Sequence, residues 1–424
     1  MTAVLPPPGQ GLDPFDEGRR QLGIDPGDET IEITQIGDQT MELNMGPQHP
    51  STHGVLRLVL DIDGEVIKDV RPDIGYLHTG FEKSFESHTY QQCIPLTDRM
   101  DYLAPPMNNL GFSLTVEKLL GCEVPPRGQY IRVIMAELAR LGSHLIWFGT
   151  HGLDMGATTP FLYAWREREK ILDINELVSG VRMMTSYIRV GGLMADVPDQ
   201  FHPMVEDVIH TFPKFIDEYE LLLTKNPIWV SRVRGVGVIS AADALAYGLS
   251  GASLRGSGVP YDLRKAQPYS SYDHFTFDVP IGRNGDVYDR YLVRMQEMRE
   301  SVKIIAQAFE NLPGGPVNTL DRKISLPPRN EINTSMESLI HHFKLVTEGF
   351  RPPRGQVYHA IESPRGELGF YIVSDGSNRP YRCKVRAPSF SNLSALPHMS
   401  RGALISDAVA VVGSIDIVLG DVDR

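Results

Sequence analysis

One apolar stripe constrains the fold of this chain more than any other feature. After Pro125 and Pro126, apolar residues recur at the three- and four-residue spacing of an α-helix, at Ile131, Ile134, Leu138, Leu141 and Leu145. The stripe is widened by Val133, Met135 and Ile146. A helix that is apolar over so much of its surface is stable when other helices surround it. The sequence therefore predicts a helical bundle with this segment near its centre.

Other segments have the same periodicity and end at proline or glycine breaks. We expect an amphipathic helix that begins after His78 and ends at Pro95, and another from Pro160 through Met184 towards Gly191. Further helices are expected at residues 107–120, 198–226, 286–311 and 334–348. The charge-alternating run 166–170 is typical of a solvated or ion-paired helix face.

The two ends of the chain have strand character instead. Strands are expected at residues 55–64, at 357–361 and 369–373 around the turn at Pro364, and at 381–386, followed by a last helix at 403–412. The predicted fold class is therefore α+β, a long-helix bundle with a small β unit near each end of the sequence. The expected units are an extended arm (1–28), an N-terminal β-rich unit (29–75), a central helical bundle (76–350) and a C-terminal α+β unit (351–424).

Charge and cysteine content exclude several classes of function. The 424 residues carry 41 Lys and Arg against 53 Asp and Glu, and no basic run, which argues against nucleic acid as a partner. We expect neither a secretory signal nor a membrane span, because no apolar run is long enough. The three cysteines are widely spaced and odd in number, so a disulfide framework is not expected.

A loop with two histidines is the most unusual local feature. Residues 45–54 read Met-Gly-Pro-Gln-His-Pro-Ser-Thr-His-Gly, and the two prolines prevent regular structure there. We expect a tight loop that joins two strands. His49 and His53 are four residues apart, but Pro50 between them excludes the helical zinc motif. There is also no Cys-x-x-Cys pair, so the chain is expected to bind no metal.

Nucleotide chemistry is not indicated, because no phosphate-binding loop and no glycine-rich strand-to-helix turn is present. The remaining candidates for chemistry are His53, Tyr102 and Asp154. Each also has an ordinary interpretation, since a loop histidine can cap backbone groups, a tyrosine can belong to the core and an aspartate can close a turn. The residue types alone leave both interpretations open.

Several blocks of sequence together resemble a known family. They are residues 46–54, 75–83, 98–102, 117–120, 334–344, 371–376 and 420–424. In this order they resemble the 49-kilodalton-type subunit of respiratory complex I, which is the D-type subunit of the bacterial proton-pumping NADH–quinone oxidoreductases. That family is related to the large subunit of nickel–iron hydrogenases, in which two Cys-x-x-Cys pairs hold the metal centre. This chain lacks both pairs, so the resemblance implies an organic-substrate pocket and a hydrogenase-like fold.

The resemblance also implies the roles of individual residues. By position, the ligands of the quinone head group are His53 and Tyr102, and the acidic partner of the histidine is Asp154. Further quinone contacts are implied for His49, Thr52 and Met107. Reduction of a quinone takes two electrons and two protons, and histidine (pKa ~6.5) and tyrosine (pKa ~10) both carry donatable protons. A charge change at His53 and Asp154 is then expected to trigger proton translocation.

The resemblance places the redox cofactors outside this chain. The electrons come from a [4Fe–4S] cluster in the neighbouring iron–sulfur subunit (B-type), with the C-type subunit of the peripheral arm beside it and the H-type membrane subunit at the quinone entrance. The expected location is the cytoplasmic face of the bacterial inner membrane, as a peripheral protein. The same chain type serves in ferredoxin- or deazaflavin-linked and photosynthetic relatives, and a scaffold without quinone chemistry is a third alternative.

One position departs from the family pattern. Many relatives have a histidine near the cluster after an Arg-Met or Arg-Phe pair, whereas here Arg182 and Met183 are followed by Met184. Methionine does not titrate, so we expect the cluster potential to depend less on pH in this protein.

Overall fold

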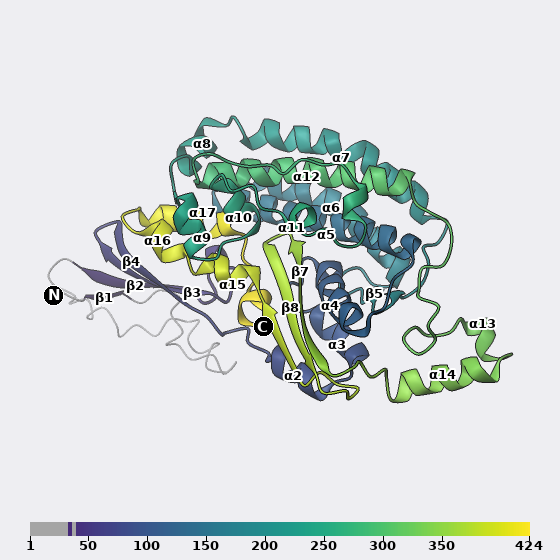
Figure 1. Ribbon diagram of the computed structural model, residues 1–424. Helices are drawn as coiled ribbons and strands as arrows, with labels where there is room; N and C mark the ends of the chain where they lie inside the picture. Colours follow the sequence, from purple (N-terminus) through teal and green to yellow (C-terminus); the bar gives the residue numbers. More distant parts are fainter. Residues whose placement is uncertain (1–32, 36–39) are drawn as a thin grey trace, which may run out of the picture.

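The long helices surround one central helix. The structure, a computed structural model, describes residues 33–35 and 40–424. Helix α5 (Pro126–Asp154) is buried over most of its length and packs against α4 (Pro105–Leu120), α6 (Thr158–Ser179) and α12 (Val287–Glu310). Helix α7 (Phe201–Leu223) covers α6 and α12 (Figure 1). The predicted α+β class and the central position of this helix are confirmed.

Shorter elements complete the helical part. They are α8 (Pro227–Val233), α9 (Ala241–Ala246), α10 (Gly251–Gly256), α11 (Leu263–Ala266), α13 (Arg329–Ile332) and α14 (Met336–Thr347), with the short strands β5 (Ile188–Arg189) and β6 (Gly192–Leu193). Helices α13 and α14 extend away from the bundle in Figure 1. Among the described residues, no helix combines the length and the apolar character needed to cross a membrane.

The N-terminal sheet carries the histidine loop. Its four strands pair antiparallel in chain order, β1 (Ile33–Gln35), β2 (Met41–Met45), β3 (Arg57–Asp63) and β4 (Val66–Asp73). Strand β3 alternates between half-buried and buried side chains, as a strand with one covered face should. The sheet contacts the C-terminal helix α16 (Leu396–Ser400), and Val66 bridges to Leu404. The N-terminal sheet thus packs against the C-terminal segment of the chain.

The C-terminal sheet brings a turn into the centre of the molecule. Strands β7 (Gly355–Ser363) and β8 (Gly366–Ser374) form a hairpin around the predicted turn, and β9 (Arg382–Arg386) pairs with β8. Strands β7 and β8 pack on α4, where the Phe370 ring meets Phe112 edge-on at 5.7 Å. The chain then ends in α15 (Pro388–Leu393), α16, α17 (Ile405–Ile415) and α18 (Leu419–Asp423).

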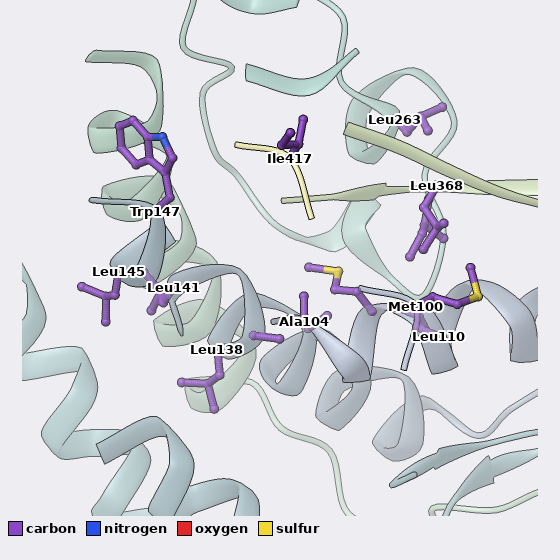
Figure 2. Close-up of a cluster of buried hydrophobic side chains, with 14 of the residues drawn as sticks. Met100, Ala104, Leu110, Leu138, Leu141, Leu145, Trp147, Leu263, Leu368 and Ile417 are labelled. Carbon is purple, nitrogen blue, oxygen red and sulfur yellow. The ribbon is translucent and has the colours of Figure 1, made fainter. Parts of the chain in front are cut away.

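A continuous apolar core joins these parts. Figure 2 shows side chains of one buried cluster, to which Leu141 and Trp147 of α5, Leu368 of β8 and Ile417 of the C-terminal segment belong. All four are 2% exposed or less. Because elements from both ends of the sequence share this core, the position of one end depends on the packing of the other.

Two predicted helix ends are wrong. The helix expected to stop at Pro95 is two helices, α2 (Phe81–Ser87) and α3 (Tyr90–Thr97), and Pro95 lies inside α3. The helical segment is interrupted at Thr89, because a new helix begins there. The side chains of Thr89 and Gln92 cap each other's backbone N–H groups. The helix expected to run through Met184 ends at Ser179, where Gly180 adopts a left-handed conformation (φ 82°).

Candidate functional site

The histidine loop is held by its own hydrogen bonds. A short 3₁₀ turn (Pro50–Thr52) lies between β2 and β3, and His49 Nδ1 accepts from the backbone N–H of Ser51 at 3.2 Å. The buried Thr52 hydroxyl donates to the carbonyl of His49 at 3.0 Å. Both side chains therefore have a structural role in the loop. Contacts of His49 and Thr52 with a quinone stay a prediction.

His53 differs from His49 because its ring is not used by the loop. The residue has a left-handed backbone (φ 55°) at the end of the turn, and its buried Nε2 atom has no hydrogen-bond partner among the described residues. Burial, together with the nearby Arg365 cation, lowers the pKa of His53 to about 4. The imidazole is therefore neutral at neutral pH, with a spare polar atom. A buried polar atom without a partner is costly, and a ligand is one way to satisfy it.

Tyr102 is influenced by the same cation. It follows α3 and α18 packs against it, so that a Cβ added at Gly420 would lie 3.2 Å from Tyr102 Cδ1. Burial, and after it the Asp101 carboxylate, raise the pKa of Tyr102, while Arg365 acts in the opposite direction. The phenol is therefore protonated at neutral pH and can donate a hydrogen bond.

Asp154 is the last residue of α5 and is half-buried. Burial raises the pKa of Asp154 to about 6, so the carboxyl can take up or release a proton near neutral pH. No hydrogen bond or ion pair between the described residues joins Asp154 to His53. The residue of α5 that interacts electrostatically with His53 is His151, one turn before Asp154. His151 is buried and neutral, and its pKa is lowered to about 3, chiefly by burial. The link between Asp154 and His53 stays a prediction.

Met107, the remaining implied contact, is fully buried near the start of α4. Its place in the apolar core gives it a packing role, and contact with a quinone stays a prediction.

Two cavities lie away from His53 and Tyr102. The larger, ≈ 1260 Å³, lies between α3, the 316–332 segment and α14. The smaller, ≈ 460 Å³, has His49 on its wall together with residues of β2 and α17, such as Met45 and Ile405. Neither cavity is lined by His53 or Tyr102. These two cavities therefore do not enclose the pair of candidate ligands.

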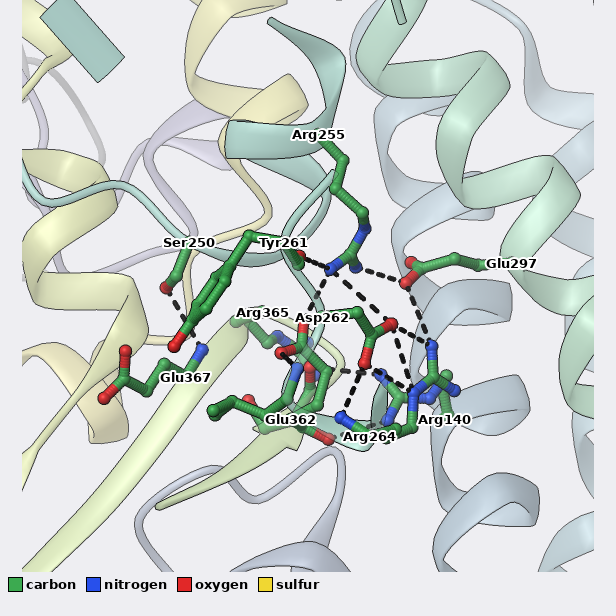
Figure 3. Close-up of polar contacts among 12 residues, drawn as sticks. Arg140, Ser250, Arg255, Tyr261, Asp262, Arg264, Glu297, Glu362, Arg365 and Glu367 are labelled. Carbon is green, nitrogen blue, oxygen red and sulfur yellow. Dashed lines mark hydrogen bonds and ion pairs between the residues drawn. The ribbon is translucent and has the colours of Figure 1, made fainter. Parts of the chain in front are cut away.

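Buried charges form a network beside the site, which sequence reasoning missed. Arg255 pairs with Glu362 at 2.7 Å, and Arg264 pairs with Asp262 at 2.7 Å (Figure 3). The same network includes Glu137, Arg140, His144, Glu297 and Tyr272. These residues come from α5, α12, the α10–α11 segment, the 3₁₀ turn Tyr272–His274 and β7, so the network joins the bundle to the C-terminal sheet. A buried ion pair that loses one partner typically costs ~3–5 kcal/mol of stability.

Arg365 is the part of this charged interior nearest to the candidate site. It is fully buried and binds Asp101 at 3.1 Å, Asp416 at 3.4 Å and the hydroxyl of Ser143. It lies in the predicted turn at Pro364, and nothing local distinguishes it from other turn arginines. No group of three or more His, Cys, Asp or Glu in the described part of the chain could hold a metal ion.

Comparisons with known proteins agree over nearly the whole chain. The family model of the 49 kDa subunit of respiratory-chain NADH dehydrogenase matches residues 154–424. The chain is similar to the second D-type subunit of NADH-quinone oxidoreductase from Chloroflexus aurantiacus, with 61% identity over 91% of this chain and 95% of that protein. The first D-type subunit of Roseiflexus castenholzii is 61% identical, covering 91% and 93%, and that of Geotalea uraniireducens is 59% identical, covering 91% and 99%.

Proposed function

The chain belongs to the family of the 49 kDa subunit of respiratory-chain NADH dehydrogenase, the D-type subunit of NADH-quinone oxidoreductase, and we propose that it carries the quinone-reduction site of that complex. In this proposal His53 and Tyr102 bind the two carbonyl oxygens of the quinone head group. The observation that carries the proposal is the buried, unpartnered Nε2 atom of His53, which shares the Arg365 cation with the protonated phenol of Tyr102.

The two side chains suit different parts of the reaction. Two electrons and two protons convert the quinone to the quinol. Tyr102 holds a proton at neutral pH and can transfer it to one carbonyl oxygen as negative charge builds up there. His53 is neutral and binds the other oxygen through an N–H donor. Negative charge arriving on the quinone favours the protonated imidazole, so His53 takes up a proton from water when the electrons arrive and can pass it to the second carbonyl oxygen, which completes the quinol.

Asp154 has the proton affinity expected of a group that exchanges protons with this site. With a pKa of about 6, it changes charge within the physiological range. We place it as the acidic partner of His53, whose charge change couples reduction to proton translocation in the membrane arm. The two side chains share no direct hydrogen bond in the described structure, so the coupling would act through space or through water.

Other subunits complete the site. The electrons come from a [4Fe–4S] cluster of the B-type iron–sulfur subunit, the C-type subunit lies beside the chain, and the H-type membrane subunit forms the entrance for the quinone tail. A pocket that closes only on assembly is consistent with the positions of the two cavities away from His53 and Tyr102. The complex places the chain on the cytoplasmic face of the membrane. The names of the relatives favour NADH over ferredoxin or a deazaflavin as the electron donor.

The replacement Tyr102→Phe in the assembled complex tests the proposal. It removes one hydroxyl and little volume, so packing should persist. NADH oxidation by a soluble artificial acceptor is compared with turnover of a long-tail quinone. We expect the artificial-acceptor rate to hold and quinone turnover to fall by ~100-fold or more, as for loss of a proton donor in general acid catalysis. Unchanged quinone turnover would show that Tyr102 is an ordinary core residue.

A further inference from the structure

Arg365 connects three segments that are far apart in the sequence. Its guanidinium binds Asp101 after α3, Ser143 in the middle of α5, and Asp416 at the end of α17. The side chain is 1% exposed, and Asp101 and Asp416 are buried beside it. A cation removed from water to this degree is stable only with anionic partners and hydrogen bonds.

The backbone of Arg365 is fixed as firmly as its side chain. Its carbonyl accepts from Asn392 Nδ2 at 3.0 Å. A Cβ at Gly251 would lie 2.6 Å from the same carbonyl oxygen, so the turn between β7 and β8 packs directly on α10. Gly366 has φ 133°, and a Cβ added there would also clash with Ser250. The guanidinium is therefore held in one position, both by the partners of the side chain and by the contacts of the backbone.

This position is tied to the segment that carries Tyr102. Asp101, which Arg365 binds at 3.1 Å, is the residue before Tyr102. The cation lowers the pKa of His53 and opposes the rise in the pKa of Tyr102. One buried charge therefore acts on both side chains, and it favours the less protonated form of each.

We propose that Arg365 is a positioning residue of the quinone site, whose fixed guanidinium holds the Tyr102 segment through Asp101 and stabilises Tyr102 after it has given up its proton. The inference rests on the proposed function. Asp101 and Asp416 hold the guanidinium and limit its field, and the three groups form a unit. Proton transfer from Tyr102 breaks its O–H bond and forms an O–H bond on the quinone, leaving a phenolate near the Arg365 cation.

The charged and titratable groups facing this unit act from several elements. Arg365 faces Asp101, Asp416, Asp421, Arg294 and Tyr102. His53 faces Arg365 and His151, and Tyr102 faces Asp101 and Arg365. Asp416 and Asp421 each have a pKa raised by burial to about 6, so both are ionised only above that pH. The negative charges of these two carboxylates therefore offset the positive charge of Arg365 most in the alkaline range.

The test is the pH profile of long-tail quinone turnover in the assembled complex, divided at each pH by the artificial-acceptor rate. Arg365→Met removes the cation, so the His53 and Tyr102 transitions should both move to higher pH, by at least about one pH unit. Arg365→Lys keeps the charge and should keep both transitions within roughly half a unit of the wild type. Arg401→Met is the matched control, because exposed Arg401 pairs with Asp69 on the surface and its loss should shift neither transition.

Asp416→Asn provides the test if the Arg365→Met variant does not assemble into the complex. It keeps the shape of the side chain and removes a negative charge beside Arg365, so the alkaline Tyr102 transition should move to lower pH, opposite to Arg365→Met. Profiles that stay unchanged in Arg365→Met and Asp416→Asn, while Tyr102→Phe abolishes quinone turnover, would overturn this inference and leave the proposed function standing. Unchanged quinone turnover in Tyr102→Phe would overturn the proposed function itself.

Discussion

The contact between Gly420 and the Tyr102 segment gives a quantitative test of how the C-terminal end positions the site. A Cβ added at Gly420 would lie 2.4 Å from the carbonyl oxygen of Met100, 3.1 Å from that of Arg99 and 3.2 Å from Tyr102 Cδ1. The first contact is about 1 Å shorter than ordinary van der Waals separation, and both partners are buried backbone. Gly420→Ala must therefore displace the Tyr102 segment from α18.

The size of the effect follows from that displacement. Overpacking of a buried site typically costs ~1–3 kcal/mol, so the chain should still fold and assemble. A reacting group misplaced by about 1 Å loses on the order of 100-fold in rate. We therefore expect Gly420→Ala to lower long-tail quinone turnover by roughly 10- to 100-fold, with the artificial-acceptor rate within about two-fold of the wild type.

The matched control is Gly314→Ala. Gly314 has no neighbouring atom within 4 Å of an added Cβ, and its backbone lies outside the left-handed region. This variant should match the wild type in both assays. The reasoning is refuted if Gly420→Ala assembles and keeps full quinone turnover, because the close contact then has no influence on Tyr102. A loss of both rates would instead indicate failed assembly.

Three further outcomes are expected. The potential of the neighbouring cluster should change little with pH because Met184 does not titrate; a steep slope in redox titrations at two pH values would contradict this. In an Asp154→Asn complex that still reduces quinone, proton translocation per electron pair, measured in proteoliposomes, should fall; full stoichiometry would exclude Asp154 from coupling. Burial lowers the pKa of His144 to about 4, so this histidine is neutral in the folded protein at neutral pH. The free energy of unfolding is therefore unaffected by the titration of His144 above pH ~6.5 and falls as the pH drops below that value, by about 1.4 kcal/mol per pH unit. His144→Gln should therefore lose less stability than the wild type between about pH 7 and about pH 5 in thermal unfolding scans, and equal slopes would count against a neutral His144.

The fold was most predictable where local pattern and tertiary packing agree. The stripe of α5, the hairpin of β7 and β8, and the loop between β2 and β3 all follow from periodicity and turn residues. The helix break at Thr89 also had a local signal, a threonine followed three residues later by Gln92, but the proline at 95 was given more weight. A proline is tolerated there because it is exposed near the end of α3 and removes only one backbone hydrogen bond.

The site was predictable only in part, because its energetics depend on long-range contacts. Resemblance pointed to His53 and Tyr102, but the cation that acts on both could not be read from sequence. Arg365 is 264 residues from Asp101 and 51 residues from Asp416, and its local context is an ordinary hairpin turn. His49 and Thr52 show the opposite case, since their hydrogen bonds within the loop are local and the motif alone does not separate structural from binding roles.

The neutral state of His53 also constrains the order of events at the site. A neutral imidazole can donate a hydrogen bond, but it has no readily lost proton, so it cannot supply both protons of quinone reduction. The phenol of Tyr102 holds its proton until negative charge develops on the quinone, because burial and Asp101 raise its pKa. In the proposed reaction, Arg365 lowers the cost of the phenolate that follows, and burial together with Arg365 keeps His53 uncharged until the electrons arrive. In the proposed reaction, the charge at His53 therefore changes after electron transfer, which is the order that a reduction-driven proton pump requires.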